Sequence, residues 1–245
     1  MMSTDNPAVL LPECVLEISL QNLMKMSRTA NGIVDVSASS TKKDVMLVSD
    51  GDEAARKANE NFISAIEYCY ANRKKKFADS AALRNFVESV GAKINQGIVK
   101  SGSLLRSGED SLKYCYTRLQ YMEEELDWFY ENLLALISDP NTDPVYLAAF
   151  MEYYVNLRIH IFADGCGKSS IALAAWMFML RDRLPVSYDS RDSYYAHGPT
   201  GVYRCGSRED REDFDNFLAY YRSLPSNDSF RNGFAQEENA CLNTV

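Results

Sequence analysis

The feature that most constrains this fold is segment 169–180, which contains helix formers, has no helix breaker and carries apolar side chains on nearly every face. A helix that is apolar all round is stable in water only when other elements enclose it. The chain has 245 residues and is 46% hydrophobic, which is enough to build a full core. The sequence therefore predicts a globular fold with this helix at its centre.

Several chemically active groups stand directly before this helix, in residues 160–168 with the sequence HIFADGCGK. A loop that runs into a helix N-terminus offers backbone N–H groups and the positive end of the helix dipole, and both suit a phosphate. His160 has an ordinary pKa near neutrality and can take a proton from a hydroxyl. Asp164 supplies the oxygen ligand that Mg²⁺ prefers beside phosphates. This combination predicts an anion site that supports transfer to a hydroxyl.

Two other interpretations apply to the same residues. Residues 165–169 imitate the end of a Walker A loop, but its first glycine would fall at Phe162, and a helix-like segment precedes it instead of a strand. The loop could also be a plain corner between two helices, with His160 hydrogen-bonded to the backbone and Lys168 in solvent. The close spacing of several active groups favours a functional loop.

The rest of the chain indicates a mostly helical organisation. Apolar periodicity predicts helices over 9–26, 53–72, 80–96, 121–137 and 143–159. Pro12 fits a first helical turn and Ser80 fits an N-cap. The last two helices carry aromatic residues that we expect in the core, namely Trp128, Phe129, Phe150, Tyr153 and Tyr154.

The loop resembles the signature of the Fic family, HPFx(D/E)GNGRxxR. The chain keeps the family residues at His160, Phe162, Asp164, Gly165 and Gly167, and it has a lysine in place of the first arginine. The sequence directly before and after the loop also resembles the family, over most of residues 50–224. The resemblance implies an all-α, mostly helical Fic fold with a short β-hairpin flap.

The same resemblance implies a division of the chain into three parts. These are an N-terminal helix and loop over 1–50, a Fic core domain over 51–224 and a flexible tail over 225–245. Segment 104–119 lies where the family has its flap, an edge that pairs with an extended segment of the target protein. An ordinary surface hairpin is the alternative for this segment.

By resemblance, the protein would move a nucleotide monophosphate, AMP from Mg·ATP, onto a Ser, Thr or Tyr hydroxyl of a protein. His160 would be the general base and Asp164 the Mg²⁺ ligand. The backbone N–H groups of Gly165, Cys166 and Gly167 would cradle the α-phosphate. Lys168 would neutralise the β-phosphate, and Phe162 would anchor the loop in the core. Tyr194 or Tyr195 would line the base pocket.

Three departures from the signature bear on the donor. Cys166 replaces an asparagine, and Lys168 keeps the charge of an arginine but lacks its bidentate fork. Ile171 occupies the position of the second arginine, and an apolar side chain cannot hold a terminal phosphate. A different donor such as UTP or CDP-choline, or a degenerate domain that only binds a nucleotide or a protein, therefore stays open.

Residues 27–32 resemble the inhibitory helix of some Fic proteins, (S/T)xxxE(G/N), with Asn31 where a glutamate is expected. In the family this glutamate pairs with the second arginine, so both members of the pair would be missing here. Losing only one would leave a buried charge without a partner, at a cost of about 3–5 kcal/mol. A helix C-terminus with Asn-Gly as its stop is the alternative.

Charge and cysteine usage exclude several classes of partner. The net charge of −8 argues against binding to nucleic acid or a membrane surface. The six cysteines form no metal-binding or disulfide pattern. No leader or membrane span is recognisable, so we expect a cytoplasmic protein whose partners are a nucleotide and a target protein. A homo-oligomer is left open.

Overall fold

The computed structural model describes residues 12–26, 51–99, 104–108 and 115–228. Within these ranges the chain is mostly helical and contains no β-strand, and no described helix is long and apolar enough to cross a membrane. The elements are α1 (Pro12–Met26), α2 (Gly51–Ala71), α3 (Ser80–Ile94), η2 (Leu119–Tyr121), α4 (Met122–Ser138), α5 (Pro144–Glu152), η3 (Tyr153–Arg158), α6 (Cys166–Met179), α7 (Arg191–Ala196) and α8 (Arg208–Ser223).

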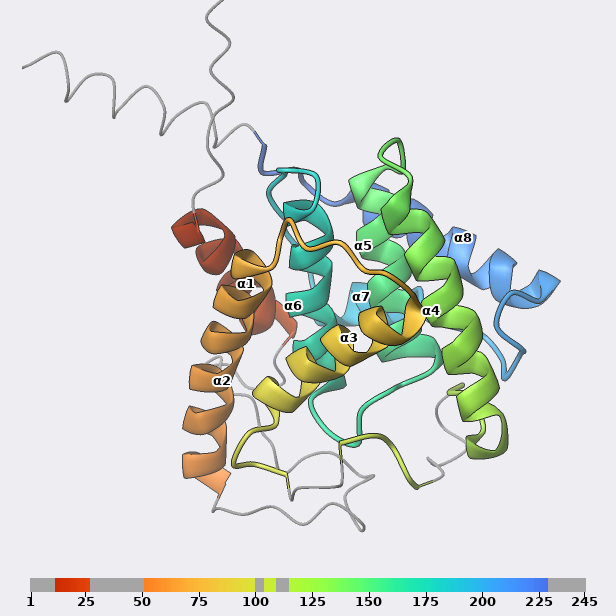
Figure 1. Cartoon of the computed structure of the whole chain (residues 1–245), viewed down its shortest axis with the longest axis horizontal. Helices are drawn as coiled ribbons and strands as arrows, with labels where there is room; N and C mark the ends of the chain where they lie inside the picture. Colours follow the sequence, from red (N-terminus) through yellow and green to blue (C-terminus); the bar gives the residue numbers. More distant parts are fainter. Residues whose placement is uncertain (1–11, 27–50, 100–103, 109–114, 229–245) are drawn as a thin grey trace, which may run out of the picture.

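Helix α6 lies at the centre of the fold, as its sequence predicts. It packs against α1, α2, α3 and α5, and every residue except Gly167 is buried (Figure 1). Trp176 is fully buried, and its indole N–H donates to the carbonyl of Asn72 at 3.3 Å. The helix begins at Cys166, three residues before the predicted start. Residues 166–168 of the loop therefore already belong to the first turn of this helix.

The other predicted helices are confirmed, with small shifts at their ends. Pro12 stands in the first turn of α1, as expected. The N-cap of α3 is Asp79 instead of Ser80, because the Asp79 carboxylate accepts a hydrogen bond from the backbone N–H of Ala82 at 2.8 Å. Both residue types cap helices well, so their order could not be decided from the sequence.

The predicted helix over 143–159 is interrupted. The α-helix α5 ends at Glu152, and the chain continues as the π-helix η3, in which the N–H of Ile159 donates to the carbonyl of Tyr154 at 3.0 Å. A π-turn places one extra residue in the helical turn and is frequent at functional sites. Here it ends at Arg158, two residues before His160.

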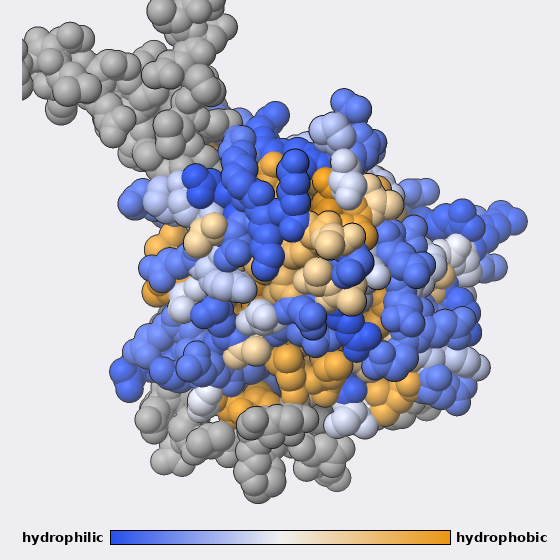
Figure 2. All heavy atoms as spheres, in the orientation of Figure 1, coloured by the Kyte–Doolittle hydropathy of each residue, from blue (hydrophilic) through white to orange (hydrophobic). Residues whose placement is uncertain are grey.

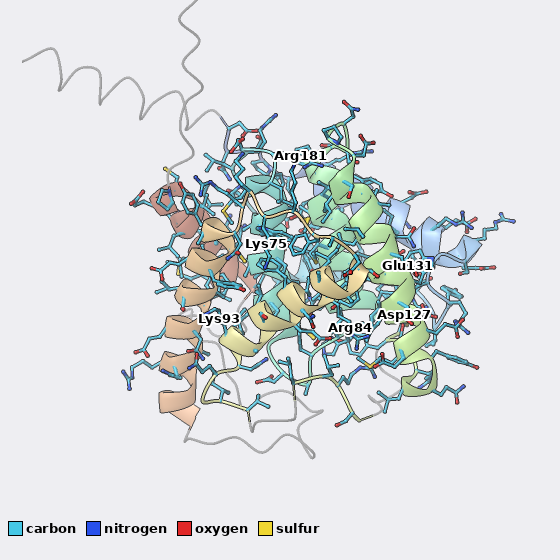
Figure 3. The ribbon with its side chains drawn as sticks, viewed as in Figure 1. Lys75, Arg84, Lys93, Asp127, Glu131 and Arg181 are labelled. Carbon is cyan, nitrogen blue, oxygen red and sulfur yellow. The ribbon has the colours of Figure 1, made fainter. Side chains whose placement is uncertain are left out.

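Arg84 forms surface ion pairs within its own helix and with a neighbouring helix. Arg84 on α3 contacts Glu88 at 2.7 Å and, across the α3–α4 boundary, Glu123 at 2.9 Å and Asp127 at 4.0 Å (Figure 3). On the same face, hydrophobic residues are visible in the middle and hydrophilic residues surround them (Figure 2). The predicted core aromatics are buried, except for Trp128, which is half-buried.

The predicted hairpin flap is not seen in the described residues. Its two described parts, 104–108 and 115–118, contain no strand, and Leu105 forms a single antiparallel bridge with Phe162 of the active loop. The N–H of Thr117 donates to the carbonyl of Arg158 at 2.8 Å. Both parts thus hydrogen-bond to the chain around His160. The flap residues 109–114 and the inhibitory-like segment 27–32 lie outside the described residues.

Candidate active site

The loop before α6 turns twice through the left-handed region of backbone conformation. His160 has a φ of 55° and Gly165 has a φ of 70°. A side chain with a Cβ rarely adopts such angles, and a Cβ on Gly165 would lie 3.0 Å from Asn95 Oδ1 and 3.1 Å from Ile94 Cγ2. Gly165 is the N-cap of α6, so the turn aims the loop backbone at the helix N-terminus. Both the backbone angle and the close neighbours therefore favour glycine at position 165.

Phe162 attaches this loop to the core. Its side chain is fully buried, and its ring fills the space that a Cβ on Gly91 of α3 would occupy, with Cε1 only 2.2 Å from that position. Backbone hydrogen bonds hold both sides of this residue. The N–H of Arg106 donates to the carbonyl of Ile161, and the N–H of Ala163 donates to the carbonyl of Leu104, each at 2.9 Å.

The side chains of Cys166 and Asn95 form hydrogen bonds with the backbone of this loop. The backbone N–H of Phe162 donates to Cys166 Sγ at 3.1 Å, and the thiol donates to the carbonyl of Phe162 at 3.2 Å. Asn95, at the C-cap of α3, donates to the carbonyls of Asp164 at 3.0 Å and Gly91 at 3.1 Å. The Cys166 side chain thus serves the shape of the loop. Sequence analysis missed Asn95, because no local pattern connects it to a loop some 70 residues later.

His160 is half-buried, and its Nδ1 lies 2.9 Å from the carbonyl oxygen of Asn156. A carbonyl only accepts, so Nδ1 carries the hydrogen and Nε2 keeps its lone pair in the neutral ring. Removal of the ring from water, opposed by the hydrogen bond to Asn156 and assisted by the nearby Arg106 charge, lowers the pKa of His160 to about 4. The imidazole is therefore neutral at pH 7.

Arg106 is the second residue that the sequence did not single out. Its guanidinium is buried and donates to the carbonyls of His160 and Ile159, each at 3.1 Å, and to the carbonyl of Thr117. One side chain thus fixes the backbone of the candidate base and joins it to segment 115–118. A charged residue in a polar loop normally lies in solvent, so nothing in the sequence indicated this role.

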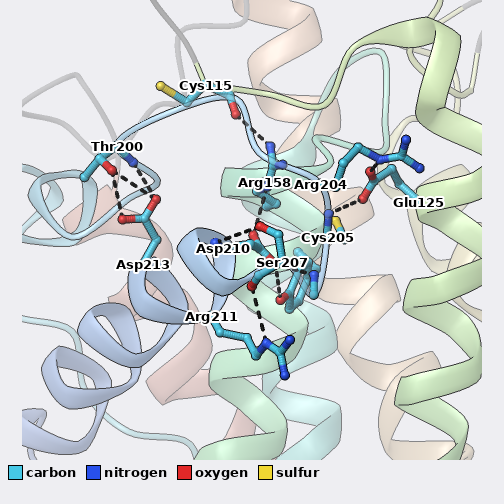
Figure 4. Close-up of polar contacts among 12 residues, drawn as sticks. Cys115, Glu125, Arg158, Thr200, Arg204, Cys205, Ser207, Asp210, Arg211 and Asp213 are labelled. Carbon is cyan, nitrogen blue, oxygen red and sulfur yellow. Dashed lines mark hydrogen bonds and ion pairs between the residues drawn. The ribbon is translucent and has the colours of Figure 1, made fainter.

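A buried ion pair holds the turn that precedes the loop. Arg158 and Asp210 are both fully buried, and Arg158 Nε donates to Asp210 Oδ1 at 2.9 Å (Figure 4). Asp210 also accepts from the hydroxyl of Tyr154 at 2.8 Å and from the N–H of Gly206 at 2.7 Å. The remaining contact of Arg158 goes to the carbonyl of Cys115 at 3.1 Å. This network joins the start of α8 to η3 and to segment 115–118.

The two tyrosines of the expected base pocket differ in burial, although their ring centroids lie only 5.2 Å apart. Tyr194 is buried among aromatic rings, and its hydroxyl accepts from Asn156 Nδ2 at 3.2 Å. Tyr195 is 37% exposed, with the guanidinium of Arg191 over its ring. Tyr194 is thus connected to His160 through Asn156, whereas Tyr195 faces the surface.

The remaining candidate residues lie on the first turns of α6 or beside it. Gly167 is half-buried, and a Cβ there would meet only Asn156 Oδ1 at 4.0 Å. Lys168 is 8% exposed, so the alternative that placed it in solvent is wrong. Ile171 is 4% exposed. Asp164 is half-buried, and no group of three or more His, Cys, Asp or Glu side chains in the described part of the chain is arranged to hold a metal.

These features describe a helical protein in which His160 and a glycine-containing loop precede the N-terminus of the central helix α6. No protein-family model matches the chain, and no curated protein is similar to it in sequence. Solved structures are similar in fold. A Fic domain-containing signaling protein from Bacteroides thetaiotaomicron is 14% identical, with a TM-score of 0.63 over 89% of this chain and 88% of its own.

A fragment of Fic-1 from C. elegans is 13% identical, with a TM-score of 0.54 over 98% of this chain and 68% of its own. At such low identity the likeness concerns the fold alone. The chain therefore has the Fic fold that the loop signature implies.

Proposed function

We propose that this protein is a Fic-type transferase that moves a nucleotide monophosphate, AMP from Mg·ATP, onto a Ser, Thr or Tyr hydroxyl of a target protein. The observation that carries the proposal is the hydrogen bond of His160 Nδ1 to the Asn156 carbonyl, which leaves Nε2 as the acceptor of the neutral ring, six residues before the start of a buried helix. Within a Fic fold, a proton acceptor close in sequence to a helix N-terminus, a type of site that suits an anion, supports this proposal.

His160 is the general base of the proposed reaction. Its Nε2 accepts the proton of the target hydroxyl while the new oxygen–phosphorus bond forms at the α-phosphate and pyrophosphate leaves. The carbonyl of Asn156 fixes the tautomer and stabilises the positive charge that develops on the ring. Because burial of the ring lowers its pKa, no proton has to leave His160 before the reaction at pH 7.

The first turn of α6 is suited to hold the phosphates. The positive end of a helix of 14 residues lies at Cys166, and the N–H groups of a first helical turn have no acceptor inside their own helix. The glycines at 165 and 167 flank Cys166 at this terminus and add no Cβ of their own. Lys168 adds a positive charge on the same turn. The glycine turn at the helix terminus fits a phosphate.

Asp164 is the residue that would hold Mg²⁺. A single carboxylate is sufficient, because Mg²⁺ in such sites takes its other oxygens from phosphates and water. When bound, the ion supplies charge neutralisation at the donor phosphates. The hydrogen bond from Asn95 to the Asp164 carbonyl fixes the backbone of this residue next to the helix terminus.

The identity of the donor is tested by binding. Calorimetry with ATP, UTP, GTP, CTP and CDP-choline, with and without Mg²⁺, is expected to show one donor that binds wild type with Mg²⁺ and fails to bind Asp164→Ala. Mass spectrometry then follows that donor's group onto target proteins. UTP or CDP-choline remains the second candidate, and of these the lack of charge at Ile171 favours CDP-choline, which has no terminal phosphate to hold.

Transfer itself is tested with two histidine variants. His160→Ala is expected to abolish transfer and to keep donor binding. His197→Ala is the matched control, because His197 has the same local geometry, with Nδ1 2.7 Å from the carbonyl of Ser193. Equal turnover by His160→Ala and wild type would refute the base. Binding of a nucleotide without transfer to any protein would leave a degenerate Fic-fold binding module, with segment 104–119 as its contact to a partner.

A further inference from the structure

Tyr116 lies face to face on the candidate base. Its ring centroid is 4.0 Å from that of His160, and the two planes differ by 11°. Both side chains are half-buried. Tyr116 comes from segment 115–118, which is more than 40 residues from His160 along the chain. The contact is therefore a product of the tertiary fold.

The backbone on both sides of Tyr116 is fixed by buried groups. Arg158 donates to the carbonyl of Cys115 at 3.1 Å, and the N–H of Thr117 donates back to the carbonyl of Arg158 at 2.8 Å. Arg106 donates to the carbonyl of Thr117. Since both arginines and Thr117 are at most 7% exposed, water competes little for these hydrogen bonds. The position of the Tyr116 ring is thus well determined.

The same Arg106 guanidinium also binds the carbonyls of Ile159 and His160. One side chain therefore holds the backbones of both partners of the stack. The imidazole is in turn limited to rotation about its own side-chain bonds, and it is held at Nδ1 by Asn156. The Tyr116 ring covers one face of the imidazole and so limits the rotation that remains to the His160 side chain.

We propose that Tyr116 is a positioning residue for His160, which holds the plane of the imidazole so that Nε2 points at the acceptor hydroxyl and which shields one ring face from water. The effect on transfer depends on the proposed function, but the contact itself does not. A misplacement of a reacting group by about 1 Å can cost on the order of 100-fold in rate. A residue that fixes the plane of the base is therefore expected to act on kcat.

A second stack of a histidine on a tyrosine in the same chain provides an internal control for this contact. The chain has two histidines, and the second, His197, stacks on Tyr220 with centroids 4.5 Å apart and planes 11° apart. His197 also has Nδ1 on the carbonyl four residues earlier, as His160 does. Removing each tyrosine in turn thus gives two matched perturbations within one protein.

The test compares Tyr116→Ala, Tyr116→Phe and Tyr220→Ala by histidine NMR and by the rate of diethylpyrocarbonate modification at each histidine. Tyr116→Ala is expected to shift the His160 ring signals downfield, through loss of the tyrosine ring current, and to raise the modification rate of His160 several-fold. The His197 signal and rate stay unchanged. Tyr220→Ala does the reverse, and Tyr116→Phe behaves as wild type.

Kinetics provide the second readout. Tyr116→Ala is expected to lower kcat about tenfold or more with little change in the KM of the donor, and Tyr116→Phe to restore it. Unchanged His160 signals in Tyr116→Ala, or a kcat that rises, would overturn the proposal. If wild type transfers no group from any donor, the proposed function fails, and the NMR and modification results still decide whether Tyr116 positions His160.

Discussion

Replacing Gly91 with alanine tests how the active loop is anchored. Gly91 lies inside α3, and a Cβ there would stand 2.2, 2.5 and 2.8 Å from three carbons of the Phe162 ring. Real Cβ contacts essentially never fall below 3.0 Å. The Phe162 ring is fully buried, and the chain on either side of it is hydrogen-bonded to segment 104–108, so the ring cannot move away freely.

Two opposing effects set the expected change in the free energy of unfolding of Gly91→Ala. Overpacking of a core typically costs about 1–3 kcal/mol, and three short contacts place this site in the upper half of that range. Alanine in a helix interior is about 1 kcal/mol better than glycine. We therefore expect Gly91→Ala to lower the free energy of unfolding by about 1–2 kcal/mol. For a chain of this size, that corresponds to a fall in Tm of roughly 2–8 °C.

The assay is urea unfolding of Gly91→Ala alone and in a Phe162→Leu background, where the ring is gone. In that background the alanine is expected to stabilise the protein by up to about 1 kcal/mol, because only the helix preference remains. Gly167→Ala is the control, a helical glycine whose Cβ would meet no atom closer than 4.0 Å. An equal cost of Gly91→Ala in both backgrounds would refute the Phe162 contact.

Three further outcomes follow from charges in the interior. Because burial lowers the pKa of His160 to about 4, transfer should keep its rate from pH 7 to pH 5 and lose it through about pH 4, and an acid limb near 6.5 would contradict this. Burial raises the pKa of Glu152 to about 8 from 4.5, so the folded state retains a proton that the unfolded state has lost in this window, and stability falls as pH rises through it. Glu152→Gln should flatten that slope in urea unfolding and gain at most about 5 kcal/mol at pH 8, whereas an unchanged slope would count against it. Asp210→Asn leaves Arg158 buried without its partner and should cost about 3–5 kcal/mol in unfolding experiments, and a loss under about 1 kcal/mol would show that the pair is not buried as described.

The helices were predictable because their signal is local. Periodic apolar residues identify α1 to α4 within a few residues, and the buried helix α6 follows from a segment that is apolar all round. The start of α6 was missed, because Gly165 adopts its left-handed turn earlier than the first apolar residue suggests. The π-turn η3 was also missed, since the helical spacing of 143–159 is compatible with an uninterrupted helix.

The hairpin over 104–119 shows the limit of local reasoning. The family resemblance implied a short hairpin here, although the sequence alternates too poorly for a sheet core, and the described backbone of Arg106 and Thr117 hydrogen-bonds to residues 161 and 158 instead. Pairing depends on which groups come close in the folded chain, and short polar segments do not encode that choice. The role of Arg106 was hidden for the same reason.

The sequence by itself determined the chemical groups of this protein and the helix that presents them: His160, Asp164, the two glycines and a central apolar helix. These follow from side-chain chemistry and from periodicity within one helical turn. Only the tertiary structure decided what surrounds His160 and its loop, namely the Tyr116 ring and the Arg106 guanidinium at His160 and the Asn95 amide at Asp164. Such contacts join residues far apart in the chain, and the energy that selects them comes from packing and burial that no local pattern records.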